Sequence, residues 1–202
     1  MALSANALTT LEALKRYLGI TSTDHDQLLE QLIEAVSARF NAFTGRLLAA
    51  RDFSCHPQDE TYDPLNAVLP ATPGPALVLP QYPVISLSEL VVDGREVPPA
   101  SEALGGWELE EASGIVRLRG AVFPPGAVVG VVYRAGLEPV PADLEQAAIE
   151  QAAVAFQESA AGQGRLGVSA RTLGESNVSY HIGELLPQVR GVLVRYQRRA
   201  LA

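Results

Sequence analysis

The chain has 202 residues, of which 48% are apolar and 19% are charged, and its formal net charge is −8. This length can bury a core as one domain with an insertion or as two small domains. No apolar run approaches the roughly 20 residues of a membrane-spanning helix, and the N-terminus lacks the basic and apolar regions of a signal peptide. A single cysteine, Cys55, excludes an internal disulfide and a multi-cysteine metal site. We therefore expect a folded protein without a membrane segment, made in a reducing cytoplasm.

Two helices are predicted in the N-terminal segment. Thr9 and Glu12 have capping-box spacing, and apolar residues follow at helical spacing as far as Gly19. An acid-rich turn over residues 21–26 precedes the clearest helix of the chain, which we expect over residues 27–44 and which a glycine follows. Its apolar stripe predicts one buried face. The stripe consists of Leu28, Leu29, Leu32, Ile33, Val36, Phe40 and Phe43.

The sequence changes character between residues 47 and 137, where eleven prolines exclude long helices. Asp93-Gly94 favours a hairpin turn, because both residues tolerate the positive φ of a type I′ turn, and Ser113-Gly114 is a second candidate. This segment is expected to form a compact antiparallel β-module of about five or six strands. The β-rich runs are Ala76–Leu79, Ser86–Val92, Trp107–Leu109, Ile115–Leu118 and Val128–Tyr133.

Two more helices are predicted after the β-module. Pro141 suits the first turn of a helix that has a face of small residues and ends near Gly162. Residues 162–183 contain five glycines and no sustained period, so we expect a flexible loop that becomes ordered only against a partner. The last helix is expected over residues 184–199, with Pro187 in its first turn.

These elements predict an α+β protein in which N- and C-terminal helices form a helical bundle core and a small antiparallel β-module is inserted between them. The expected boundaries are residues 1–46 for the N-terminal helices, 47–137 for the β-module and 138–202 for the C-terminal helices with their loop.

The sequence offers no strong catalytic or metal-binding signal, so we expect neither an enzyme nor a cofactor. The histidines, His25, His56 and His181, stand in three different segments without metal-ligand spacing. Cys55 has no local signature of a base beside it, and a half-buried strand residue is the better interpretation. Trp107, at a strand start, is interpreted as a core residue rather than a sugar-binding platform.

Charge is unevenly distributed along the chain. An acidic protein is not expected to wrap nucleic acid, because phosphate contacts require clustered Lys and Arg. The last 18 residues nevertheless contain four arginines and no acid. Two interpretations remain open: a solvated helix end whose cations suit the helix dipole, or an electrostatic docking surface for an acidic protein or, with less support, for DNA.

Several short motifs, read together, resemble one known family. Thr44-Gly45-Arg46 follows the long helix, and Asp24-His25-Asp26 precedes it. Similar motifs continue along most of the chain: Leu79-Pro80, Val92-Asp93-Gly94, Tyr133-x-Ala135-Gly136, Val140-Pro141-x-Asp143-Leu144, Leu173 to Tyr180, and Leu186-Pro187 with Leu193, Tyr196 and Arg198. The chain resembles the head–tail connector (adaptor) proteins of long-tailed bacteriophages, in the longer form that carries a β insertion.

The resemblance implies a structural virion protein. It implies a ring, typically a dodecamer, beneath the portal protein at the neck, after assembly in the host cytoplasm. The ring would extend the channel through which genomic DNA passes without specific binding, and would offer a platform for a tail-completion (stopper) protein.

The resemblance and the residue patterns together predict three groups of contact residues. Portal binding is assigned to Pro187, Arg190, Leu193, Tyr196, Arg198 and Arg199. The docking loop is represented by Arg165, Arg171, Ser179 and Tyr180. The interface between subunits is assigned to Leu29, Ile33, Phe40, Ala148 and Ala152.

Two alternatives stay open at this point. One is a different neck or tail-completion ring protein. The other is a small hydrolase or carbohydrate-binding module, which would require a concave site in the β-module with converging carboxylates or an exposed Trp107.

Overall fold

The computed structural model describes residues 3–55, 76–101, 105–159, 170–173, 176–179 and 185–197. The protein has an α+β fold, as predicted, and divides into two compact units. Met1–Ala49 and Pro139–Ala202 make up the first, which we call the helical unit; Ala50–Glu138 make up the second, for which we keep the name β-module. These boundaries lie within a few residues of those expected from the sequence.

The helical unit begins with α1 (Leu11–Leu18) and α2 (Asp26–Thr44). Thr10 caps α1, since its side chain accepts a hydrogen bond from the Ala13 N–H at 3.1 Å. The predicted cap, Thr9, is wrong by one residue, because the Thr9 side chain is buried and its hydroxyl lies 3.4 Å from Glu145 Oε1. Both helices end at glycines with a φ of +68°, a left-handed conformation that favours glycine.

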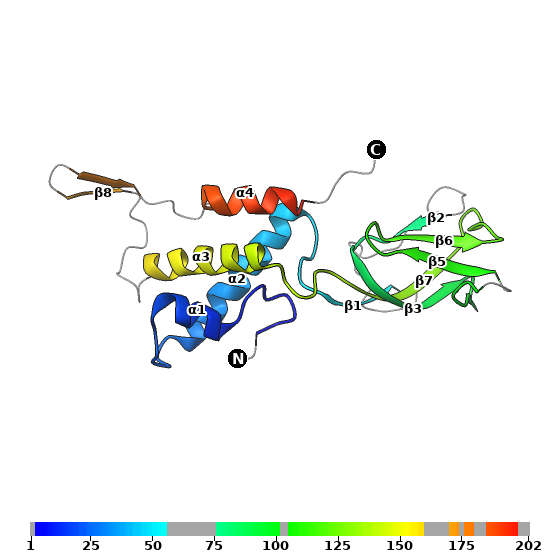
Figure 1. The fold of residues 1–202 in the computed structure, drawn as a ribbon, viewed down its shortest axis with the longest axis horizontal. Coiled ribbons are helices and arrows are strands. Elements are labelled where there is room, and N and C mark those ends of the chain that lie inside the picture. Colours follow the sequence, from blue (N-terminus) through cyan, green and yellow to red (C-terminus); the bar gives the residue numbers. More distant parts are fainter. Residues whose placement is uncertain are drawn as a thin grey trace. The chain divides into compact units, whose positions relative to one another are not determined.

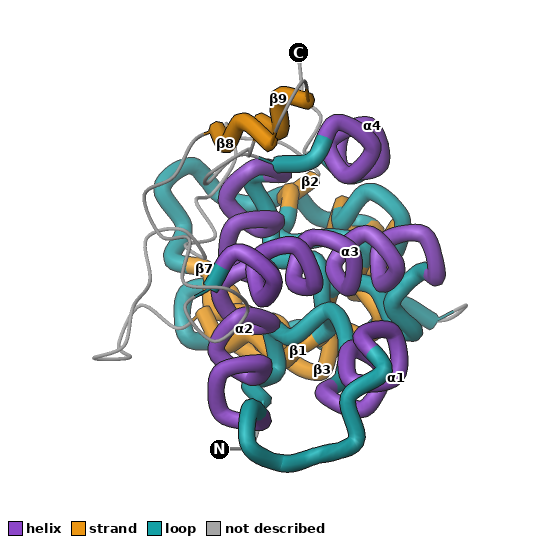
Figure 2. The backbone as a smooth tube through the Cα atoms, turned by 90° about the vertical axis from the view of Figure 1, so that its left-hand side faces the viewer, coloured by secondary structure: helices purple, strands orange, loops and turns teal. Residues whose placement is uncertain are grey.

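Helix α3 (Ala142–Glu158) is the centre of the helical unit and contacts α1, α2 and α4 (Pro187–Arg195). It lies between α1 and α4, with α2 crossing it (Figures 1 and 2). Ala147, Ala148 and Ala152 are each at most 3% exposed. These small side chains allow the neighbouring helices to approach closely, as the sequence pattern suggested. Helix α4 runs antiparallel to α3, because residues at its end contact the start of α3.

The β-module has two antiparallel sheets in its described part. The first has the strand order β1-β7-β3-β4 and the second has the order β2-β6-β5. The bounds are β1 Arg51–Cys55, β2 Ala76–Val78, β3 Val84–Val92, β4 Arg95–Glu96, β5 Gly106–Glu110, β6 Ile115–Arg119 and β7 Val129–Ala135. The sequence pattern predicted five of these strands but not β1 or β4.

The two turns predicted from the sequence join neighbouring strands of the sheets. Asp93 and Gly94 have φ of 50° and 75° and join β3 to β4, so the expected hairpin is confirmed. Gly114, at φ 68°, ends the turn between β5 and β6. Inward-facing side chains of both sheets form the core of the module, in which the rings of Phe53 and Tyr133 stack at 5.2 Å.

Two short strands lie within the segment that was predicted to be a loop. β8 (Ala170–Leu173) and β9 (Ser176–Ser179) pair as an antiparallel hairpin. The prediction of a structureless segment over 162–183 is therefore wrong for these eight residues. Each of the two short runs contains a β-branched residue, Thr172 or Val178, which favours strand pairing over too few residues to produce a visible period.

The last two helices are shorter than expected within the described residues: α3 ends at Glu158, and α4 covers only nine residues. No helix in the described ranges combines the length and the apolar character needed to cross a membrane.

Candidate partner-binding surface

Helix α4 is held in place along its apolar face. Val189 and Leu193 are fully buried. Pro187 occupies the first turn, where a missing backbone N–H costs nothing. Just before it, the Leu186 N–H donates a hydrogen bond of 3.0 Å to Oε1 of Gln151, a buried side chain on α3. The start of the helix is therefore fixed to the middle of α3.

The end of α4 is fixed by one carboxylate at the start of α3. Asp143 Oδ2 pairs with Arg195 at 2.8 Å, and Oδ1 accepts a hydrogen bond from the Tyr196 hydroxyl at 2.7 Å. Oδ1 also accepts from the Leu144 N–H at 2.9 Å, an N–H that donates to the Pro141 carbonyl oxygen as well, at 3.0 Å. Burial, followed by the hydrogen bond to Asp143 and its charge, raises the pKa of Tyr196. Both ends of α4 are thus bound to α3.

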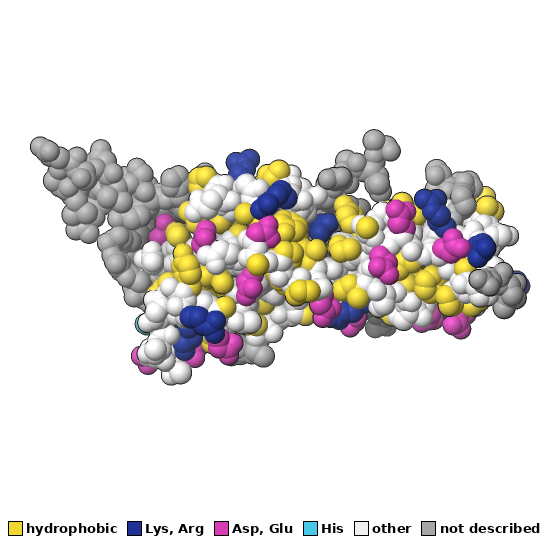
Figure 3. All heavy atoms as spheres, viewed as in Figure 1, with side chains coloured by type: hydrophobic (Ala, Val, Ile, Leu, Met, Phe, Trp, Pro, Cys, Tyr) yellow, Lys and Arg dark blue, Asp and Glu magenta, His cyan; other side chains and the backbone are white. Residues whose placement is uncertain are grey.

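The opposite face of α4 is open. Arg190 and Arg195 are exposed, and basic side chains stand at the surface over this helix in Figure 3. Val194 is 53% exposed beside them, and a methyl group added at Gly191 would meet no atom within 4 Å. The Arg190 guanidinium lies 6.0 Å from the centre of the Phe43 ring. Arg195 is already paired with Asp143 of α3, so Arg190 and Val194 are the cation and the apolar side chain that α4 offers here without an acid of its own, which suits an acidic protein surface with an apolar centre.

The structure separates the residues predicted to bind the portal into three groups. Pro187 and Arg190 are on the exposed face. Tyr196 is half-buried and bonded to Asp143. The prediction for Leu193 is wrong, because its side chain has no exposure and belongs to the core of the helical unit. Arg198 and Arg199 lie outside the described residues, as do Arg165 and Tyr180 of the predicted docking loop. Arg171 and Ser179 lie in β8 and β9, paired with Val178 and Ala170 respectively.

All five residues predicted to form the subunit interface are buried inside the helical unit, with at most 1% of each exposed. A side chain without exposed surface cannot contact a neighbouring copy, so this prediction is corrected: Leu29, Ile33, Phe40, Ala148 and Ala152 hold the four helices of one chain together. The sequence pattern identified close helix packing but not that the packing is within one chain.

Among its described residues, the β-module shows neither converging carboxylates nor a fully exposed Trp107, which a hydrolase or sugar-binding module would need. Trp107 is half-buried, on the face of β5 opposite to Glu108. The carboxylates of β5 pair across the sheet with β6, Glu108 with Arg119 at 3.7 Å and Glu110 with Arg117 at 3.9 Å. Figure 3 shows acidic and basic side chains interspersed over this unit. In the described ranges, no three His, Cys, Asp or Glu side chains are placed to hold a metal.

Cys55, the candidate nucleophile, and His25 are both packed against other parts of the protein. Cys55 is 6% exposed at the end of β1 and is more deeply buried than the sequence suggested. His25 precedes α2 and packs its ring against Phe156 of α3, with 5.5 Å between ring centres. His56 and His181 are outside the described residues.

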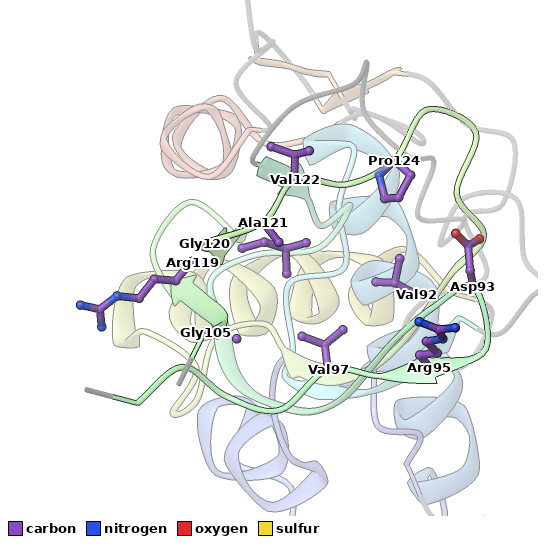
Figure 4. A pocket seen from close by; sticks show the side chains of 12 residues that line it. Val92, Asp93, Arg95, Val97, Gly105, Arg119, Gly120, Ala121, Val122 and Pro124 are labelled. Carbon is purple, nitrogen blue, oxygen red and sulfur yellow. The ribbon is translucent and has the colours of Figure 1, made fainter. Parts of the chain in front are cut away.

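A groove of about 640 Å³ opens at one end of the β-module (Figure 4). One wall is the hairpin around Asp93, and the other runs from Arg119, the last residue of β6, to Pro124. Val92, Val97 and Val122 give it an apolar lining. Asp93 is the one carboxylate among the described lining residues, and its Oδ1 accepts a 2.9 Å hydrogen bond from the Val128 N–H.

Charge is divided unequally between the two units. The β-module contains 5 basic and 12 acidic residues, a net charge of −7, whereas the helical unit contains 10 and 11, a net charge of −1. The acidic character inferred from the sequence therefore belongs almost entirely to the β-module, and the helical unit that carries α4 is close to neutral.

Sequence reasoning missed Asp143 and Gln151 as the residues that anchor α4. In the sequence, Asp143 is recognisable only as part of a helix-start motif. Its contacts with Arg195 and Tyr196 depend on the antiparallel arrangement of α3 and α4. Gln151 was visible as the one polar residue on the alanine-rich face of its helix, which is the signal that could have marked it.

The fold is that of an α+β protein whose helix α4 is anchored at both ends and exposes its other face. A family model described as head completion protein (HCP) matches residues 7–199. The chain therefore belongs to the head completion protein family, and the resemblance to connector proteins is confirmed at this level. Membership makes it a structural component of a phage-like particle, at the stage where the head is completed.

A comparison with solved structures shows that this fold occurs in a known structure. The chain is similar to a protein chain in the neck of an empty GTA particle, which was computed with C6 symmetry. The two are 24% identical with a TM-score of 0.62, and the match covers 100% of this chain and 95% of that one. Seven chains of known structure match significantly. No curated protein does.

Proposed function

We propose that this protein is a head–tail connector: copies assemble as a ring beneath the portal protein, extend the DNA channel and provide the platform on which a tail-completion protein binds. The observation that carries the proposal is helix α4, which is fixed at both ends to α3 and presents an acid-free face to solvent in a member of the head completion protein family.

The exposed face of α4 is the proposed contact with the portal. A rigid helix loses little conformational freedom when it binds, so most of its contact energy is kept as affinity. Val194 supplies an apolar centre, and Arg190 supplies a cation for an acidic partner. The side chains of Arg198 and Arg199 are proposed to extend this contact beyond the described end of the helix.

A ring is supported by the neighbour in the GTA neck, whose sixfold symmetry requires copies that repeat around one axis. Closed rings of identical chains need head-to-tail contacts, in which two different surfaces of the chain meet. We propose twelve copies, a number that a sixfold axis permits, assembled in the host cytoplasm and retained in the virion neck.

The charges of the protein suit a channel through which DNA slides. Tight non-specific binding of DNA needs clusters of Lys and Arg that release counterions from the phosphates. With net charges of −7 and −1, neither unit has an excess of basic residues. We therefore propose that genomic DNA passes the ring without specific binding.

The test is cosedimentation of the purified chain with DNA-filled heads that carry the portal. The variant Arg190→Glu/Val194→Glu should lose at least nine tenths of the binding, because it places two carboxylates where the portal is proposed to be acidic. Gln188→Glu, also exposed on α4, is the matched control for a new carboxylate outside this pair. Equal binding by the double variant and the wild type would refute the assignment to α4.

Point changes are preferable to deletion of residues 185–202. That deletion would remove Val189 and Leu193 from the core and expose the face of α3 that they cover, so a loss of binding after it would report unfolding as readily as a lost contact. A variant that fails to bind heads but still binds an isolated tail-completion protein would favour a different place in the neck.

A further inference from the structure

The groove at the end of the β-module contains an arginine whose charge is not matched within the described structure. Four of the five arginines of the module have assigned contacts: Arg117, Arg119 and Arg134 form ion pairs, and Arg51 lies over the Phe53 ring at 4.9 Å. Arg95 lines the groove and makes no ion pair with any described residue. In a unit with a net charge of −7, an unpaired cation is a specific place for an acidic ligand.

The shape of the groove depends on specific residues around it. A Cβ atom at Gly106 would come within 2.3 Å of the Pro98 carbonyl oxygen, and one at Gly105 within 2.7 Å of the Arg119 carbonyl oxygen. Only glycines allow these segments to approach so closely and shape the floor. On the other side of the groove, the Asp93 carboxylate fixes the hairpin to Val128.

The rim of the groove is unusually apolar. Val122 and Val128 are 61% and 53% exposed and are among the most exposed large apolar residues described. Val122 lines the groove, and Val128 adjoins it through the two hydrogen bonds that its backbone makes with Asp93. Together with the apolar lining residues Val92 and Val97, these exposed valines make the groove and its rim apolar, which indicates a contact surface. A ligand that spans the groove therefore needs a carboxylate for Arg95 on the hairpin wall and a small apolar group for Val122 on the opposite wall.

The opposite end of the same module has those two features. Glu111 and Ala112 are exposed in the turn after β5, and Glu111 makes no ion pair within the described ranges. The Glu111 carbonyl accepts a 2.8 Å hydrogen bond from the Val84 N–H, at the start of β3, whereas Val92, at the end of β3, lines the groove. At roughly 3.4 Å per residue, the five steps from Gly106, which lines the groove, to Glu111 place this turn about 17 Å from the groove. One chain therefore cannot fill its own groove with it.

We propose that the groove between the Asp93 hairpin and residues 119–124 receives the Glu111-Ala112 turn of a second copy of this chain. Arg95 pairs with the Glu111 carboxylate of the neighbour, and Ala112 packs against Val122. Two different ends of one module meet, so the contact is head-to-tail and repeats from copy to copy, as ring closure requires. It also reduces the repulsion between adjacent acidic modules. This inference rests on the proposed ring.

The experiment is a charge exchange within one chain. Wild type, Arg95→Glu, Glu111→Arg and the double variant Arg95→Glu/Glu111→Arg are mixed with isolated portal, and the fraction of portals that carry a closed ring is counted by electron microscopy. Each single variant should reduce this fraction at least tenfold, and the double variant should restore it to within about twofold of wild type, because every contact then again joins opposite charges. Arg39→Glu, an exposed change of equal charge on α2, is the control and should assemble normally.

Folding does not confound this test, because Arg95, Glu111 and Val122 are all exposed. Val122→Asp provides a second probe and should also prevent ring closure while leaving the unfolding free energy unchanged. Normal rings from either single charge variant, or a double variant as defective as the singles, would overturn the proposed contact.

If the proposed ring on the portal is wrong, the contact between copies can still be tested separately. If wild type does not bind the portal at all, the same four proteins are compared for self-association by sedimentation velocity at high concentration. The same order, with wild type and double variant above both single variants, would support the contact without the portal. Absence of any self-association in wild type would overturn it.

Discussion

The hydroxyl of Tyr196 donates a 2.7 Å hydrogen bond to Asp143, which stands 53 residues earlier in the chain. This bond joins the residue that follows α4 to the first turn of α3, and the Arg195 guanidinium binds the other oxygen of the same carboxylate. One side chain therefore determines where the end of the proposed docking helix lies.

Replacing Tyr196 with Phe should lower the free energy of unfolding by about 1 kcal/mol, the range expected for a partly exposed hydrogen bond to a charged group. Asp143→Ala should cost more, about 2 kcal/mol, because Arg195 and Tyr196 lose their common partner and the Leu144 N–H keeps only its bond to the Pro141 carbonyl. Urea denaturation measures both. Gln188→Ala, on the exposed side of α4, should change the free energy by less than about 0.5 kcal/mol. If Tyr196→Phe and Asp143→Ala lowered the unfolding free energy no more than Gln188→Ala does, Asp143 would not anchor the helix.

Tyr133, in the core of the β-module, can be replaced with Phe to test whether its hydroxyl contributes to stability at neutral pH. Its hydroxyl is buried and has no hydrogen-bond partner among the described residues, although the Gln81 backbone is close by. Tyr133→Phe should therefore leave the unfolding free energy unchanged or raise it by about 1 kcal/mol. Thermal and urea unfolding at pH 7 provide the measurement. A loss of more than 1 kcal/mol would reveal a bond to the hydroxyl that the geometry does not show.

Tyr133 also predicts sensitivity to alkali. Burial, followed by the nearby Cys55, raises the pKa of Tyr133 above its ordinary value of 10.0. A raised folded-state pKa gives stability that is complete below the unfolded-state pKa and is lost as the pH rises toward the folded-state pKa. The unfolding free energy of wild type should therefore fall above about pH 10, and Tyr133→Phe should fall less. Parallel curves for the two proteins would contradict this account. Tyr196, whose pKa is also raised, contributes in the same direction.

Ala152 tests whether the small-residue face of α3 packs within one chain. The side chain has no exposure, so Ala152→Leu should overpack the helical unit and cost about 1–3 kcal/mol of unfolding free energy in the monomer. The control is Ala35→Leu, an exposed position on α2, for which little change is expected. If Ala152→Leu kept the monomer stable but prevented ring assembly, the residue would instead belong to an interface between copies.

Gly191 lies in the middle of a nine-residue helix with open space where its Cβ would be. Gly191→Ala should stabilise the protein by about 0.5–1 kcal/mol, because alanine restricts the unfolded chain and favours the helix. Chemical denaturation checks this value. A decrease in stability would mean that the backbone at this position is less helical than the structure shows.

Elements that depend on a few adjacent residues could be predicted from the sequence. Periodic leucines and a following glycine indicated α2, and Asp93-Gly94 indicated the β3–β4 hairpin, since each depends on a few adjacent residues. β1 was missed because Arg51–Cys55 contains no β-branched residue, and its pairing with β7 joins segments about eighty residues apart. Such a strand is stabilised by its partner rather than by its own propensity.

The candidate surface was only half predictable. The sequence located the acid-free arginine helix, but it does not say which side of a short helix faces the core, so Leu193 was assigned to the partner instead of to α3. The anchor on Asp143 depends on the register of two antiparallel helices, which no local pattern encodes. Similarly, Arg95 is recognised as unpaired only when the partners of the other arginines are known.

The central claim is that α4 binds the portal from a closed ring of this chain. The most direct measurement is a cryo-EM reconstruction of the purified protein bound to isolated portal, without imposed symmetry. The account predicts a closed ring around the channel axis, with Arg190 and Val194 of every copy against the portal and Tyr196 still bonded to Asp143. A reconstruction in which the exposed face of α4 points to solvent, or in which copies bind without touching one another, would contradict it.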